Sequence, residues 1–234
     1  MGYKSGLSYE PLPLPDRMSF SEESVAAEAR TFRERMSNRH TIRDFSDRDV
    51  PFSVVRDLIA TAGNAPSGAN HQPWHFVAIS NHDIKAKIRA AAEEEETKFY
   101  GGGAPDDWLA ALEPIGTGVS KPHLTTAPWL IVVFAQRYGL SDKGEKYKNY
   151  YVPESVGIAS GFLIVAAHHA GLYCLTHTPN PMKFLTEICE RPDHEKPIMI
   201  IALGHAAAVA TVPQAAKVKK PFGEICTLFS KKGA

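Results

Sequence analysis

Residues 129–135 read Trp-Leu-Ile-Val-Val-Phe-Ala and contain no polar side chain. A run of this length, rich in β-branched residues, predicts a strand with both faces buried. Such a strand needs other elements packed against each face, and this need constrains the fold more than any other feature. Shorter apolar runs at 74–79, 173–176 and 198–203 predict three more strands.

Helical patterns separate these predicted strands. We expect helices over residues 19–36, 51–63, 81–100, 153–170 and 181–189. Ser19 and Glu22 have the spacing of a capping box, and Pro51 suits the first turn of a helix. The helix after Pro51 is expected to bury one stripe, made of Phe52, Val55, Leu58, Ile59 and Ala62. Buried strands that alternate with helices predict one α+β domain.

The segments at 1–18 and 101–121 differ from this pattern. Three prolines alternate with leucines in residues 1–18, which we expect to form an extended arm ahead of a single domain at 19–234. Three glycines open residues 101–121, which are rich in Gly, Pro and Asp. Long irregular segments in compact domains are often functional, so we expect 101–121 to be a mobile active-site lid.

The composition excludes several classes of protein. Twenty-six basic residues balance 26 acidic ones, so bulk charge does not favour a nucleic acid or membrane partner. The three cysteines include no CxxC, and no apolar run is long enough for a membrane span. No signal-peptide pattern is present, so we expect a cytoplasmic protein. HExxH, GxSxG, P-loop and GxGxxG motifs are absent, and we expect no metal.

The stretch from Ala65 to Trp74 joins a predicted helix to a predicted strand. It contains Pro, Ser, Gly and Asn, which allow a sharp turn that presents backbone N–H groups. We expect this loop to lie against one face of a flavin; an ordinary connecting loop is the alternative.

Three further groups could contact a phosphorylated cofactor. Arg39, His40, Thr41 and Arg43 offer guanidinium and hydroxyl donors within five residues, although a solvated basic turn has the same composition. Thr176-His177-Thr178-Pro179 stands at the end of a strand, where α/β folds commonly bind ligands, although an ordinary polar strand end is the alternative. The late lysines are a third, weaker candidate that is equally compatible with a solvated tail: Lys217, Lys219 and Lys220.

A different set could bind an amino acid. Glu96 and Tyr100 stand one helical turn apart, and Lys121 follows the predicted lid. The carboxylate suits an ammonium group, whereas the phenol and the lysine suit a carboxylate. Glu96 belongs to a run of four glutamates, so a solvated helix face is the alternative.

Taken together, these motifs resemble the flavin-dependent nitroreductase superfamily and, within it, the iodotyrosine deiodinase family. The resemblance covers most of the chain from about residue 8. It rests on separated motifs in the family's order: 39–45, 66–74, the Glu-rich helix ending at Tyr100, 121–128, 150–156, 176–179 and 210–213.

The resemblance implies a central mixed sheet flanked by helices, and an intertwined FMN-binding homodimer with active sites at the subunit interface. By matching position, the implied FMN contacts are Arg39, His40, Thr41, Arg43, Ser67, Gly68, Thr176, His177, Thr178 and Lys219. Thr178 is the implied catalytic donor to flavin N5. The implied substrate contacts are Ala69, through its backbone N–H, and Glu96, Tyr100 and Lys121.

The function that we expect is FMN-dependent reductive dehalogenation of halotyrosines, with release of halide and tyrosine and with electrons from an external donor. Two alternatives stay open. One is a general nitro or quinone reductase that uses NAD(P)H. The other is a non-catalytic or flavin-consuming FMN-binding protein.

Overall fold

A four-stranded sheet forms the centre of the computed structural model, which describes residues 8–230. Its strands are β1 (Trp74–Ile79), β2 (Trp129–Gln136), β6 (Glu195–Gly204) and β5 (Tyr173–His177), in that spatial order. All three pairings between them are antiparallel. We expected a mixed sheet, which also contains parallel pairing. Within residues 8–230, the parallel pairing is one isolated bridge, between Thr41 and Cys174 of β5.

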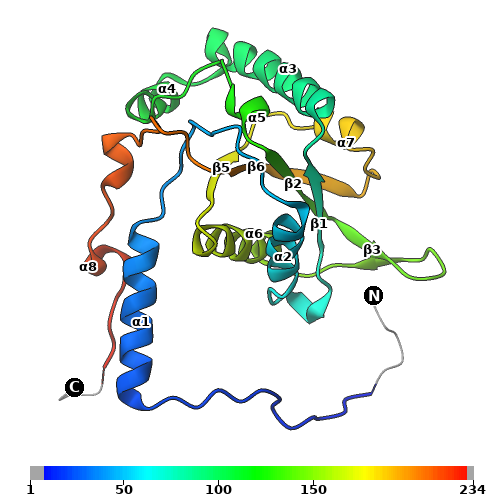
Figure 1. Cartoon of the computed structure of the whole chain (residues 1–234). Helices are drawn as coiled ribbons and strands as arrows, with labels where there is room; N and C mark the ends of the chain where they lie inside the picture. The colour runs from blue at the N-terminus through cyan, green and yellow to red at the C-terminus, as the bar shows by residue number, and fades with distance from the viewer. Residues whose placement is uncertain (1–7, 231–234) are drawn as a thin grey trace.

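Alternate side chains of strand β2 pack into two separate hydrophobic cores, one on each face of the sheet. Its residues Trp129, Ile131, Val133 and Ala135 pack on one face with α2 (Phe52–Gly63) and α6 (Val152–His169). Leu130, Val132 and Phe134 pack on the other with α3 (His82–Lys98), α5 (His123–Thr126) and α7 (Phe184–Ile188). Figure 1 shows these two helical layers on opposite sides of the sheet. The prediction of a strand buried on both faces is confirmed.

Most predicted elements form near their expected places, with a few differences. Helix α1 spans Glu22–Ser37, and its N-cap is Ser21, whose hydroxyl accepts a hydrogen bond from Ser24 N; the predicted capping box at Ser19 is wrong. Phe52 is exposed, because it begins α2 outside the core and only meets Trp129 at the rim. A short second sheet, β3 (Tyr138–Leu140) with β4 (Lys146–Lys148), was not predicted.

The 101–121 segment is more regular than its composition indicates. A π-helical turn (Phe99–Gly103) continues α3, and it is followed by α4 (Asp106–Leu112) and a 3-10 turn (Glu113–Ile115). Asp106 and Asp107 stabilise the start of α4 because their charges oppose the helix dipole. The mobility of this segment stays a prediction.

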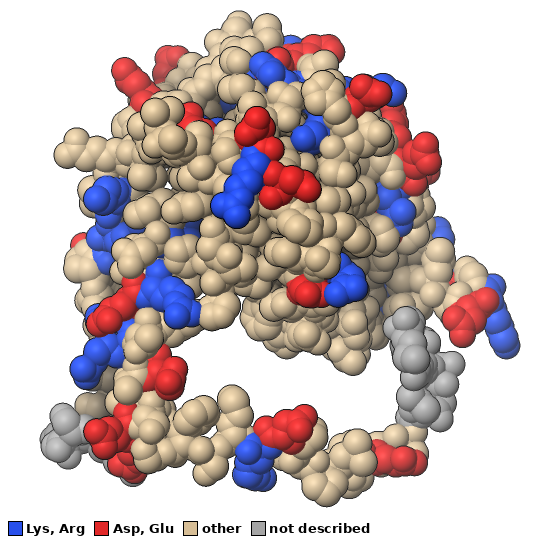
Figure 2. All heavy atoms as spheres, viewed as in Figure 1, with Lys and Arg blue, Asp and Glu red and all other residues tan. Residues whose placement is uncertain are grey.

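Residues 8–37 and the C-terminal segment extend away from the main body (Figure 1). Residues 8–21 form no helix or strand, and α1 has no buried residue. The C-terminal segment holds a 3-10 turn (Gln214–Lys217) and α8 (Phe222–Ile225). Positive and negative side chains are interspersed over the face in Figure 2, in keeping with the zero net charge. Among the described residues, no helix is long and apolar enough to cross a membrane.

A buried lysine on α3 donates hydrogen bonds to backbone carbonyls that precede β2. Lys85 is 6% exposed, and its Nζ donates to the backbone carbonyls of Ala127 at 2.8 Å, Thr125 at 3.3 Å and Pro128 at 3.5 Å. Burial lowers the pKa of this ammonium group. The contacts hold α3 against the end of α5 and the residues between α5 and β2.

We predict that Lys85→Met lowers the free energy of unfolding by about 2 kcal/mol, because it leaves buried carbonyls without a donor. The exposed Lys87 on the same helix gives a matched control, and Lys87→Met should change it by less than ~0.5 kcal/mol. Urea unfolding followed by circular dichroism measures both. Equal midpoints for the two variants would contradict the anchoring role.

Candidate functional site

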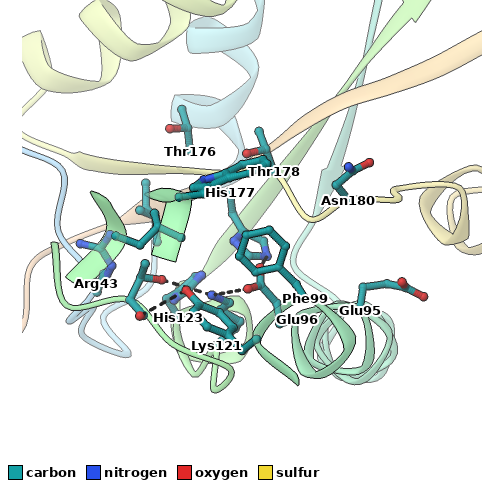
Figure 3. Close-up of a pocket in the computed structure, with 15 residues that line it drawn as sticks. Arg43, Glu95, Glu96, Phe99, Lys121, His123, Thr176, His177, Thr178 and Asn180 are labelled. Atoms are coloured by element: carbon teal, nitrogen blue, oxygen red, sulfur yellow. Dashed lines mark hydrogen bonds and ion pairs between the residues drawn. The ribbon is translucent and has the colours of Figure 1, made fainter. Parts of the chain in front are cut away.

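A pocket lies between the α3–α4 region and the carboxyl end of β5 (Figure 3). Helix α3 and its π-helical end contribute Glu96 and Tyr100, and the segment after α4 contributes Lys121. Other polar lining residues include Arg43 from the segment before α2, His123 from α5, Thr176 and His177 from β5, and Thr178 directly after β5. Residues far apart in sequence therefore meet in one cavity.

The three residues expected to bind an amino acid lie together. Lys121 Nζ is 3.1 Å from Glu96 Oε2, and the side chains of Lys121 and Glu96 are 4% and 13% exposed. Both Lys121 and Tyr100 also contact Thr117: Lys121 Nζ donates to Thr117 Oγ1 at 3.2 Å, and the Tyr100 hydroxyl donates to the Thr117 carbonyl at 3.2 Å. Because water is largely excluded here, the two charges interact more strongly than they would at the surface.

Lys121 is also held through its backbone. Its N–H donates to Glu93 Oε1 at 2.7 Å, and the same oxygen accepts from Arg89 Nε at 2.8 Å. Glu93 and Glu96 lie close on one side of α3, one turn apart. Helix α3 thus fixes both the backbone and the charged end of Lys121.

Two buried histidines stand beside the ion pair. His177 and His123 are 8% and 4% exposed, their rings meet edge to face at 5.4 Å, and neither Nε2 has a hydrogen-bond partner among the described residues. Burial lowers the pKa of His177 to about 3, assisted by His123, Lys121 and Arg43. Burial, with Lys121, Arg43 and Arg89, lowers the pKa of His123 to about 4. Both imidazoles are neutral at pH 7.

Side chains alternate in direction at the end of β5. Thr176 and Thr178 are exposed, whereas His177 between them is buried. In Figure 3, Thr176 points away from the Glu96–Lys121 pair and His177 lies on the side of that pair. The three residues expected to contact one cofactor are therefore divided between two faces of the strand.

The cationic segment runs beside β5. Thr41 pairs with Cys174 in the parallel bridge, and Arg39 is close enough to influence the Cys174 thiol electrostatically. Arg43 reaches the pocket itself, and burial lowers its pKa, partly opposed by Tyr100 and Asp44. Arg39, His40 and Thr41 are half-buried but do not line this pocket.

The loop at 65–74 lies at the other end of the molecule, beyond the start of β1 (Figure 1). Ser67 Oγ accepts from Gln72 N at 2.9 Å, and a Cβ on Gly68 would meet the Tyr150 carbonyl at 2.6 Å. Ala69 is exposed, with φ of 50°. The exposed Lys219 also lies outside the pocket, and its Nζ donates to the Ala216 carbonyl. A single chain does not bring these residues to Glu96.

Neither His123 nor Thr117 was predicted from the sequence. His123 is buried against His177 of β5, which is distant in the chain, and the role of Thr117 depends on its contacts with Tyr100 and Lys121. Across residues 8–230, no three of His, Cys, Asp and Glu gather as a metal ligand set.

Residues 36–205 match the model of the nitroreductase family. The chain belongs to this family. A protein of Haliscomenobacter hydrossis named iodotyrosine deiodinase is 48% identical over 194 residues, which are 83% of this chain and 87% of that protein. Human iodotyrosine deiodinase 1 is 38% identical over 207 residues, 88% of this chain and 71% of that protein. The resemblance of the sequence to the iodotyrosine deiodinases is thus confirmed.

A comparison with solved structures shows the fold. The crystal structure of an oxidised iodotyrosine deiodinase bound to FMN and 3-iodo-L-tyrosine superposes with a TM-score of 0.67 at 24% identity, covering 87% of this chain and 99% of that one. A BluB-like flavoprotein of Clostridium difficile superposes with a TM-score of 0.65 at 21% identity, covering 85% and 98%. The predicted nitroreductase-like α+β fold is confirmed.

We predict that this family member loses stability as pH falls from about 6.5 toward 4. His123 and His177 bind protons in the unfolded chain below their ordinary pKa of 6.5, but in the folded chain only near pH 4 and 3. Each then lowers the free energy of unfolding by up to ~1.4 kcal/mol per pH unit. Urea unfolding between pH 7 and 5 should give a shallower pH slope for the His123→Gln/His177→Gln double variant. An unchanged slope would show that these imidazoles do not stay neutral in the fold.

Proposed function

We propose that the protein is an FMN-dependent oxidoreductase that removes halogen reductively from halotyrosines. The observation that carries this proposal is the buried pair of Glu96 and Lys121, joined through Thr117 to Tyr100, beside the threonines of β5. The relatives named iodotyrosine deiodinase support the same substrate class.

The donors around β5 fit a flavin phosphate and ring edge. Guanidinium groups of Arg39 and Arg43 and the hydroxyl of Thr41 suit a phosphate, and the exposed hydroxyls of Thr176 and Thr178 suit the polar edge of a flavin. His40 and Lys219 are weaker candidates for the phosphate. Among these residues, Thr178 is our proposed catalytic donor. When bound, FMN supplies the two electrons that reduction of the carbon–halogen bond consumes.

The charged pair fits the amino acid part of a tyrosine. Glu96 would bind the substrate ammonium, while Lys121 and Tyr100 would bind its carboxylate. The proposed lid at 101–121, with α4, would then exclude water and orient the ring. The overall reaction replaces halogen by hydrogen: the halotyrosine takes up two electrons and one proton and releases tyrosine and a halide ion.

A second copy of the chain would complete the site. Ser67, Gly68 and Ala69 belong to the 65–74 loop. This loop lies at the other end of the molecule from α3, as Figure 1 shows. Large apolar side chains stand exposed on α1, α6 and the C-terminal segment, including Phe32, Phe162, Phe222 and Ile225. Their burial between two copies would supply the driving force for an intertwined homodimer. The loop of one protomer would then approach the flavin and substrate of its partner.

Membership of the nitroreductase family also supports a second candidate, a general nitro or quinone reductase. It would reduce nitroaromatics well, although these compounds carry no zwitterion for Glu96 and Lys121, and it would bind halotyrosines poorly. A non-catalytic FMN-binding protein would bind flavin without halide release. The use of NAD(P)H and the cytoplasmic location stay predictions.

We predict that Glu96→Gln weakens binding of 3-iodotyrosine roughly 10- to 100-fold, because a buried ammonium loses its counter-charge. Lys121→Met should weaken it similarly through the substrate carboxylate. The exposed Glu94 of the same helix provides the control, and Glu94→Gln should change affinity less than about twofold. Quenching of flavin fluorescence during titration measures all of these affinities. Unchanged affinity in the Glu96 and Lys121 variants would refute the substrate assignment.

We also predict that the protein is a dimer whose dissociation constant rises at least ~10-fold when Phe222 and Ile225 on α8 are both replaced by Asp, because two exposed apolar side chains become charged. Analytical ultracentrifugation would follow the shift toward the 25.6 kDa monomer. The exposed Glu224 lies on the same helix, and Glu224→Gln should leave the dimer intact. A monomeric parent protein would overturn the dimer proposal.

A further inference from the structure

His177 occupies a position that the proposed cofactor site does not explain. It is the last residue of β5, and its side chain is buried while the threonines on either side are exposed. Its Nε2 atom is buried and without a hydrogen-bond partner among the described residues. The carboxylate of Glu96 lies in front of it, with Oε1 4.0 Å from this nitrogen (Figure 3).

The two oxygens of Glu96 face different partners. Oε2 is held by Lys121 Nζ at 3.1 Å, whereas Oε1 faces His177 Nε2 across a gap slightly too long for a hydrogen bond. A bound amino acid would draw Lys121 toward its own carboxylate. Glu96 would then lose its partner at Oε2, and a small rotation toward His177 would bring Oε1 within hydrogen-bond distance.

The surroundings of His177 keep its imidazole neutral. Burial disfavours a positive charge there, as do His123 on α5, Lys121, and Arg43 on the segment before α2, while the Glu96 carboxylate on α3 lies 4.0 Å from Nε2. A neutral N–H donor fixes the direction of a carboxylate without cancelling its charge. A cation at the same place would compete with the substrate ammonium for Glu96.

We propose that His177 is a positioning residue for the amino acid site: its Nε2–H holds one oxygen of Glu96, so that the full negative charge of Glu96 faces the substrate ammonium. This inference rests on the proposed function for the identity of the ligand. It assigns His177 to the substrate side of β5 and not to the flavin contacts expected from the sequence.

Two substitutions separate this role from a packing role. His177→Phe keeps a ring and removes the donor, whereas His177→Gln keeps a neutral N–H donor. In the FMN-loaded protein, His177→Phe should weaken 3-iodotyrosine binding about 10-fold, and His177→Gln should keep affinity within about threefold of the parent. Affinity for 2-iodophenol, which lacks the zwitterion, should not change in either variant. Equal losses for Phe and Gln, or a parallel loss for 2-iodophenol, would overturn the proposal.

A double variant tests whether His177 acts through Glu96. Once Glu96 is replaced by Gln, adding His177→Phe should weaken 3-iodotyrosine binding little further, whereas additive losses would contradict the coupling. His75 lies on β1, at the opposite edge of the sheet, so His75→Phe is a control for loss of a partly buried imidazole and should leave the affinity unchanged.

A measurement without substrate distinguishes failure of this inference from failure of the proposed function. Nitrogen NMR of the histidine rings should find the proton of His177 on Nε2, with a resonance that shifts in Glu96→Gln. A proton on Nδ1 alone, or no shift, would overturn the inference even if 3-iodotyrosine binds. If the parent protein does not bind 3-iodotyrosine, the proposed function fails, and the NMR result alone decides whether the Nε2–H of His177 faces Glu96 across the 4.0 Å gap.

Discussion

The burial of β2 on both faces is the constraint on which the rest of the structure depends. Its side chains pack into two hydrophobic cores, so helical layers must cover the sheet on both sides. No open face of the sheet therefore remains for a ligand. Functional groups are therefore confined to the ends and edges of the sheet. The β5 edge meets this need, since the 39–45 segment pairs with it through Thr41 and Cys174, and with Ala206 after β6 through Phe45, which brings arginines close to the threonines of β5.

The same layered arrangement separates two parts of the proposed site. The pocket forms where α3 and the α4 region pass the carboxyl end of β5, while the 65–74 loop caps the opposite end of the molecule (Figure 1). Gly68 lies so close to the backbone at Tyr150 that a Cβ would collide with it, so this loop packs against its own chain. A homodimer, as proposed, joins the two parts without moving either of them, and it also covers the apolar side chains of α1 and the C-terminal segment.

Features encoded by local pattern were predictable, and features that depend on distant partners were not. The buried strands and α2, α3 and α6 follow from apolar runs and helical spacing. The β3–β4 hairpin was missed because strands of three residues carry no periodicity, and Lys85 looked like any surface lysine. For the site, Glu96, Tyr100 and Lys121 were predicted as a group, and they lie together. Side chains alternate along a strand, so the sequence alone could have predicted that His177 points away from the side of Thr176 and Thr178. The burial of His123 could not have been predicted in this way.

Specificity for an amino acid follows from the cost of separating the charges of the pocket. In a site of low dielectric constant, removing one partner of a buried ion pair costs about 3–5 kcal/mol, because the other charge is left uncompensated. A ligand that offers one charge would have to leave either Glu96 or Lys121 unpaired. A zwitterion replaces both partners at once, and a neutral imidazole at His177 adds a donor without adding a third charge. Neutral ring compounds would leave the Glu96–Lys121 pair intact and gain nothing from it, so the pair favours amino acids over other flavin substrates.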